Sequence, residues 1–96
     1  MSYPQWRSGF VVAEDGTVHG RIRQQDKWGI RWEGNVPDHI SVPISVAADL
    51  LHVTPMAVHH WITAGVISTH TRFGQHVVPM AELAILAIDR GVVDEE

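Results

Sequence analysis

The sequence predicts a small α+β fold, in which an antiparallel three-stranded β-meander precedes two short helices, a β-hairpin and a last helix. Three observations carry this prediction: apolar and polar residues alternate in the first third, helix-start and helix-stop signals follow, and turn-forming residues separate the segments. A length of 96 residues suits one domain, or two small units that share a core. The expected segments are a β-meander over 1–40 packed on the rest, a helical unit over 41–93 and an acidic tail over 94–96.

Three short runs make up the predicted meander. The runs 10–13 and 18–23 flank a Glu-Asp-Gly-Thr turn signal, and a third run places Trp28, Ile30 and Trp32 on one face. An isolated small sheet is marginal in water, so we expect Trp28 and Trp32 to pack against the helices. Stacking of these rings on single-stranded nucleic acid is the less favoured alternative. A linker is expected over 35–39.

Two short helices joined by a tight turn are predicted next. Ser45 is the expected N-cap of a helix over 46–51, whose Ala and Leu residues fall on one buried face. Thr54 and Pro55 then supply an N-cap and a proline in the first helical turn, which together are a strong start signal. This second helix is expected to run to about Ala64 and to end at Gly65 in a left-handed conformation.

The second helix has two distinct faces. Val58, Trp61 and Ile62 form an apolar stripe that is expected to pack on the first helix. The opposite stripe, expected to face outward, consists of Met56, His59, His60 and Thr63.

A β-hairpin and a last helix complete the prediction. Strands over 66–71 and 76–78 are expected to flank a turn at 72–75, and a helix over 80–90 is expected to end at Gly91. The last helix has more apolar residues than one packing face needs, which makes self-association plausible. These residues are Leu83, Ile85, Leu86 and Ile88.

Several short motifs follow one another along the chain in the same order as in a known family. They are an Ala-Ala-Asp-Leu-Leu helix, a Val-Thr-Pro turn, a Val-His-His-Trp helix, Ala-Gly-Val-Ile, a Gly-Gln-His segment and a Glu-Leu helix. In this order, over about 44–90, the chain resembles the MerR/excisionase-type winged helix-turn-helix family. The resemblance implies a small protein that binds specific double-stranded DNA, as a transcriptional regulator or as an excisionase-like architectural factor of phage or mobile-element origin. Because one such module reads few base pairs, we expect useful affinity to need several copies on adjacent or repeated sites.

The resemblance also implies where DNA would be contacted. The recognition helix 55–64 would enter the major groove, and the wing 67–78 would reach the backbone or the minor groove. The expected contact residues are Thr54, Met56, His59, His60, Thr63, Arg72, Gln75 and His76. A possible secondary contact surface on the meander consists of Arg21, Arg23 and Arg31.

The charge of the chain favours a competing interpretation in which DNA binding is weak. The chain carries 7 Lys+Arg against 11 Asp+Glu, a net charge of −4, and it has His59 and His60 where the family usually has basic residues. In the family, the turn before the second helix often contains Gly. His52 occupies that position here, so its backbone would have to adopt a left-handed conformation. The alternatives are a protein-interaction module, or a packaging factor similar to phage terminase small subunits, on the same fold with weak DNA binding.

Other function classes find no support in the sequence. The absence of cysteine excludes disulfides, Cys-ligated zinc and thiol catalysis, and the histidine spacing is unsuited to a metal. No Gly-rich phosphate loop, nucleophile elbow or His-Glu-x-x-His motif is present, so we expect no enzyme activity and no cofactor. No apolar run is long enough for a membrane span and no secretory signal is recognisable, which leads us to expect a cytoplasmic protein.

Overall fold

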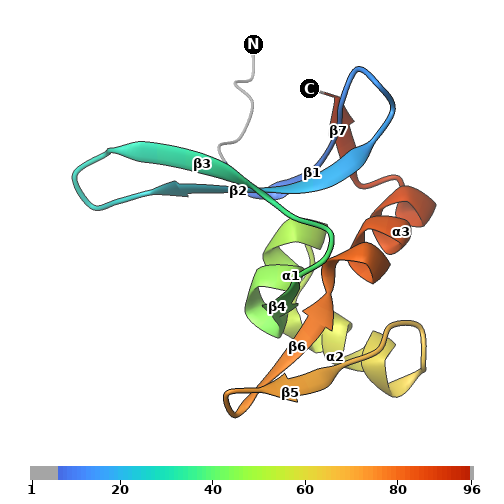
Figure 1. Ribbon diagram of the computed structural model, residues 1–96. Coiled ribbons are helices and arrows are strands. Elements are labelled where there is room, and N and C mark those ends of the chain that lie inside the picture. Colours follow the sequence, from blue (N-terminus) through green and yellow to red (C-terminus); the bar gives the residue numbers. More distant parts are fainter. Residues whose placement is uncertain (1–6, 96) are drawn as a thin grey trace.

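The computed structural model describes residues 7–95, so the first six residues of the expected meander segment and Glu96 of the expected tail lie outside it (Figure 1). The described part is a small α+β fold with three helices and two sheets. In chain order the elements are β1 (Gly9–Val12), β2 (Val18–Gln25), β3 (Arg31–Val36), β4 (Ser41–Pro43), α1 (Ile44–Leu51), α2 (Pro55–Thr63), β5 (His70–Arg72), β6 (Gln75–Pro79), α3 (Met80–Arg90) and β7 (Val93–Glu95).

The predicted meander is confirmed as the antiparallel strands β1, β2 and β3. Its third strand is displaced, because β3 begins at Arg31 rather than Trp28 and continues to Val36, inside the expected linker. The residues before it form a loop that Asp26 closes: its carboxylate accepts from the backbone N–H groups of Trp28 and Ile30, both at 2.9 Å. These local hydrogen bonds take the place of strand pairing.

Two residues of the expected acidic tail form part of a strand. Asp94 and Glu95 belong to β7, which pairs in parallel with β1, with Phe10 opposite Val93. The first sheet is therefore mixed, with strand order β3-β2-β1-β7. The structure differs from the expected tail at Asp94 and Glu95 because the open edge of β1 supplies backbone partners that no local sequence pattern reveals.

The second sheet contains a strand that the sequence did not reveal. β4 pairs with β6, with Val42 opposite Val78, and β6 pairs with β5 in the expected hairpin. The hairpin strands differ in length from the prediction: β5 starts only at His70, while β6 extends through Pro79. All pairings in this sheet, of order β4-β6-β5, are antiparallel.

The helix boundaries follow local signals to different degrees. α1 begins at Ile44 after Pro43, with no side-chain cap, so the expected N-cap role of Ser45 is not observed. α2 begins as predicted at Thr54-Pro55, where the Thr54 hydroxyl accepts from the backbone N–H of Ala57 at 3.3 Å. Gly65 follows the helix with φ of 79°, the left-handed conformation expected for it.

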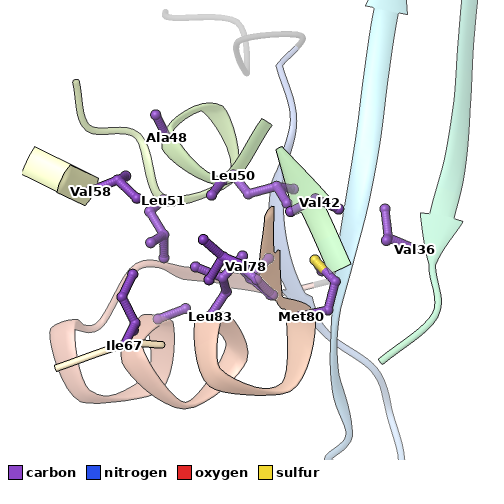
Figure 2. Close-up of a cluster of buried hydrophobic side chains, with 13 residues drawn as sticks. Val36, Val42, Ala48, Leu50, Leu51, Val58, Ile67, Val78, Met80 and Leu83 are labelled. Atoms are coloured by element: carbon purple, nitrogen blue, oxygen red, sulfur yellow. The ribbon is translucent and has the colours of Figure 1, made fainter. Parts of the chain in front are cut away.

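One buried apolar cluster joins the helices to both sheets (Figure 2). Leu50 of α1, Val58 of α2 and Leu83 of α3 are each fully buried, and Phe10 of β1 belongs to the same cluster. The remaining members are Val36, Val42, Ala47, Ala48, Leu51, Ile67, Val78, Met80 and Ala87.

Gly20 of β2 allows the first sheet to approach the helices closely. A Cβ atom at this position would lie 2.5 Å from Cε of Met80, a fully buried side chain at the start of α3. The absence of a side chain at Gly20 therefore lets Met80 fill this part of the core.

The expected packing of Trp28 and Trp32 against the helices was wrong. Trp28, Ile30 and Trp32 are 75%, 63% and 52% exposed. Figure 1 shows why: the β2–β3 hairpin projects beyond the helices, so its far end has no helix to pack against. Lys27 partly covers this end, with Nζ 4.6 Å from the centre of the Trp28 ring.

Within the described residues, no helix has the length and apolar character needed to cross a membrane.

Candidate nucleic-acid interface

The exposed stripe of α2 is the feature on which a nucleic-acid interface depends. Its four side chains all reach solvent, and neither sheet covers them. On the opposite side Val58 is fully buried, and Trp61 and Ile62 are half-buried against the core. The helix therefore has the two faces that the sequence predicts. The exposed residues are Met56, His59, His60 and Thr63.

In the turn before α2, His52 has the left-handed conformation that the resemblance implied, with φ of 58° and ψ of 42°. Its ring is held by a distant part of the chain. Nε2 lies 2.8 Å from the Ser8 carbonyl oxygen and Nδ1 lies 3.1 Å from an Arg7 guanidinium nitrogen. A carbonyl can only accept and a guanidinium can only donate, so Nε2 carries the hydrogen and Nδ1 accepts. These bonds fix the turn against the start of β1.

Hydroxyl groups lie at both ends of α2. Thr54 caps the first turn and is exposed, and Thr63 in the last turn donates to the His59 carbonyl at 3.0 Å. A hydroxyl that donates one hydrogen bond retains lone pairs, and one that accepts retains its hydrogen. Both groups can therefore still bond to a phosphate or a base edge.

The β5–β6 hairpin presents the remaining predicted contact residues. Arg72 and Gln75 are directly opposite each other and share one face of its exposed end, while Thr71 and His76 share the other. The base of the hairpin is anchored by Thr69, whose hydroxyl donates to the Val77 carbonyl at 3.0 Å. In Figure 1 this hairpin and α2 lie at the same end of the molecule, away from the β2–β3 hairpin.

Charge on this surface differs from charge on the whole chain. No Asp or Glu occurs between Asp49 and Glu82, so α2 and the hairpin contain no carboxylate. Glu82 itself accepts hydrogen bonds from the backbone and hydroxyl of Ser68. The same stretch contributes one exposed arginine, Arg72, and four exposed histidines. These are His59, His60, His70 and His76.

The secondary surface of Arg21, Arg23 and Arg31 lies on the first sheet and is engaged by its own neighbours. Arg21 Nε donates to the Asn35 side chain at 3.0 Å, and Arg31 Nε donates to the Gln25 side chain at 3.3 Å. Arg23 forms a salt bridge with Glu33 at 3.0 Å. These contacts hold the guanidinium groups across β2 and β3, and the structure does not bring them to α2.

A cavity of about 410 Å³ lies apart from the α2 surface. Polar groups of Arg7, Arg23 and His52 line it together with the end of α1, and none of the eight predicted primary contact residues does. Among the described residues, no three His, Asp or Glu side chains gather to hold a metal ion.

Sequence reasoning missed Phe73, which occupies the turn between β5 and β6. Its side chain is 98% exposed and its φ is 50°, followed by Gly74 with φ of 77°. The Phe-Gly pair in the middle of a hairpin was the available signal, because two-residue turns favour Asn or Gly at that first position.

Comparison of the chain with protein-family models, with curated proteins and with solved structures finds no match.

Proposed function

We propose that this protein binds specific sites in double-stranded DNA through a winged helix-turn-helix, with α1 and α2 as the two helices and the β5–β6 hairpin as the wing. The observation that carries this proposal is the exposed, carboxylate-free surface of α2 and the hairpin. An exposed helix that follows a tight turn and carries hydrogen-bonding side chains at i, i+3, i+4 and i+7 suits the major groove.

Each group has a defined task in this proposal. Met56 contacts a thymine methyl, while His59, His60 and Thr63 bond to base edges or phosphates. Arg72 binds phosphate or enters the minor groove from the wing, with Gln75 and His76 beside it. The biological role fits a small transcriptional regulator or an excisionase-like architectural factor.

Affinity is expected to depend on more than one copy. Each phosphate neutralised by a Lys or Arg adds about 0.9 to the slope of log affinity against log salt. Arg72 supplies one such contact, so cooperative binding on adjacent sites is part of the proposal. Ile85 and Ile88 are exposed on α3 and offer an apolar surface for self-association. Sedimentation analysis of the protein on DNA with one or two adjacent sites tests this, and non-cooperative filling of the two sites would contradict it.

Arg72→Ala and Lys27→Ala remove the same charge from different hairpins. After selection of a binding sequence from random duplexes, Arg72→Ala should weaken binding several-fold and lower the salt slope by about 1. Lys27→Ala changes the net charge equally but lies at the end of the other hairpin, so it should leave affinity nearly unchanged. Fluorescence anisotropy over a range of salt concentrations measures both quantities.

Equal effects of the two substitutions would show that only overall charge matters and would remove the wing from the interface. Failure of the selection to enrich any duplex would contradict the proposed function itself.

A protein-interaction module is the second candidate function. The observation in its favour is the exposed apolar end of the β2–β3 hairpin, formed by Trp28, Ile30 and Trp32. Exposed aromatic side chains of this size are typical anchors of protein interfaces. The duplex selection separates the two candidates, because a module without DNA affinity enriches no sequence even at low salt.

A further inference from the structure

Phe73 adopts a backbone conformation that its residue type disfavours. Two non-glycine residues within 7–95 have positive φ, His52 and Phe73. The ring of His52 makes hydrogen bonds with Ser8 and Arg7, which offset its strain. Phe73 is 98% exposed, so contacts within its own chain do not offset the cost of its conformation.

The turn that contains Phe73 would be better served by another residue. Arg72 pairs with Gln75, so Phe73 and Gly74 form a two-residue connection with positive φ at both positions. This pattern favours Asn-Gly, because asparagine tolerates the left-handed region and is well solvated. A phenylalanine here is unfavourable for folding and also exposes a large apolar ring. Backbone strain at an exposed position points to a role outside the folded chain.

We propose that Phe73 is an apolar wedge that enters the minor groove of DNA and partly unstacks one base step beside the sequence bound by α2. This inference rests on the proposed function. The proposed function places α2 in the major groove and the wing on the backbone or in the minor groove. Proteins that bind the minor groove use Arg, Lys, Asn or Gln there, and they frequently insert an apolar side chain between base steps. Arg72 directly precedes Phe73 and shares a hairpin face with Gln75, so the tip provides a cation, a hydrogen-bonding amide and an apolar ring together.

The wedge predicts a bent complex. Insertion of an apolar side chain kinks DNA by roughly 20–90° toward the major groove, and steps that unstack easily, such as TA, are the favoured positions. The protein therefore gains a preference for a flexible step at a position where the wing forms no hydrogen bond to a base edge.

Phe73→Asn tests the wedge without damaging the fold. The probe is a duplex of about 30 base pairs that contains the selected binding sequence with TA steps beside it, and a fluorophore pair on its ends reports bending by energy transfer. Wild type should bend the duplex, whereas Phe73→Asn should bind about tenfold more weakly and leave it nearly straight. Because asparagine suits the turn, the variant should melt at an equal or higher temperature, so lost bending cannot be attributed to unfolding.

Two matched variants complete the test. Phe73→Leu retains an apolar side chain and should retain part of the bend. Trp28→Asn removes an exposed aromatic ring from the other hairpin and should leave the bend unchanged. Bending by Phe73→Asn equal to that of wild type, or a straight duplex in the wild-type complex, would overturn the wedge while leaving DNA binding intact. If wild type binds no duplex at all, the proposed function and the wedge both fail.

Discussion

His52 combines an unfavourable backbone conformation with favourable side-chain contacts. A non-glycine residue in the left-handed region costs about 1–2 kcal/mol. The two hydrogen bonds of its ring, to Ser8 and Arg7, contribute about 1 kcal/mol each. The two effects nearly cancel, which explains why a histidine can occupy a position that glycine often fills.

Two substitutions at His52 separate these effects. His52→Ala keeps the backbone strain and loses both hydrogen bonds, so the free energy of unfolding should fall by about 1–2 kcal/mol. His52→Gly loses the same bonds but relieves the strain, and its stability should lie close to that of wild type. Urea unfolding measures both variants. If His52→Ala is as stable as His52→Gly, the left-handed strain is not significant.

The left-handed conformation of His52 was expected from the family resemblance, in which this turn position is often filled by Gly. The ring contacts were not, because Ser8 and Arg7 lie more than forty residues away in sequence. Phe73 shows a similar limit. Its positive φ follows from the length of the turn, but its exposure depends on how far the hairpin extends.

At the scale of elements, α2 was predictable because its boundaries are coded locally. Thr54, Pro55 and Gly65 set its start and stop within a few residues, and the apolar stripe fixes its buried face. The strands β4 and β7 were not predictable. Each is three residues long. β4 forms because it pairs with β6, and β7 forms because it pairs with β1, and neither has a strand pattern of its own.

The alternation at Trp28, Ile30 and Trp32 shows a different limit. Alternating apolar residues indicate one apolar face, but they do not say whether anything covers it. Here Asp26 closes a loop before β3 begins, and the hairpin carries these side chains beyond the helices.

His59 and His60 are the two histidines that α2 presents in the proposed interface. Their imidazole rings are exposed and can hydrogen-bond to base edges or phosphates. Replacing both by Ala should therefore weaken binding to a selected duplex several-fold. His39→Ala, an exposed histidine outside the surface, serves as the control.

Anisotropy titrations with the selected duplex measure this effect. Unchanged affinity of the His59→Ala, His60→Ala double variant would remove both residues from the contact surface and leave the wing as its main part.

At the scale of the whole molecule, net charge is a poor guide to the candidate interface. The total of −4 argues against nucleic-acid binding, yet the carboxylates lie outside residues 50–81. The fold places that carboxylate-free stretch at one end, as α2 and the β5–β6 hairpin, and the exposed apolar end of the β2–β3 hairpin elsewhere (Figure 1). Such a separation allows one surface to bind DNA while another binds protein.

The positions of the two hairpins determine which residues should respond to DNA binding. If the proposal is correct, the backbone of α2 and of the wing responds to DNA, and the β2–β3 hairpin does not respond at a single isolated site.

Nuclear magnetic resonance titration of the isotopically labelled protein with a selected duplex measures this most directly, because each backbone amide reports its own surroundings. We predict that the largest shift changes fall within 54–63 and 70–76, with little change over 24–33. Changes confined to the β2–β3 hairpin, or no changes at any DNA concentration, would contradict a groove-binding role for α2.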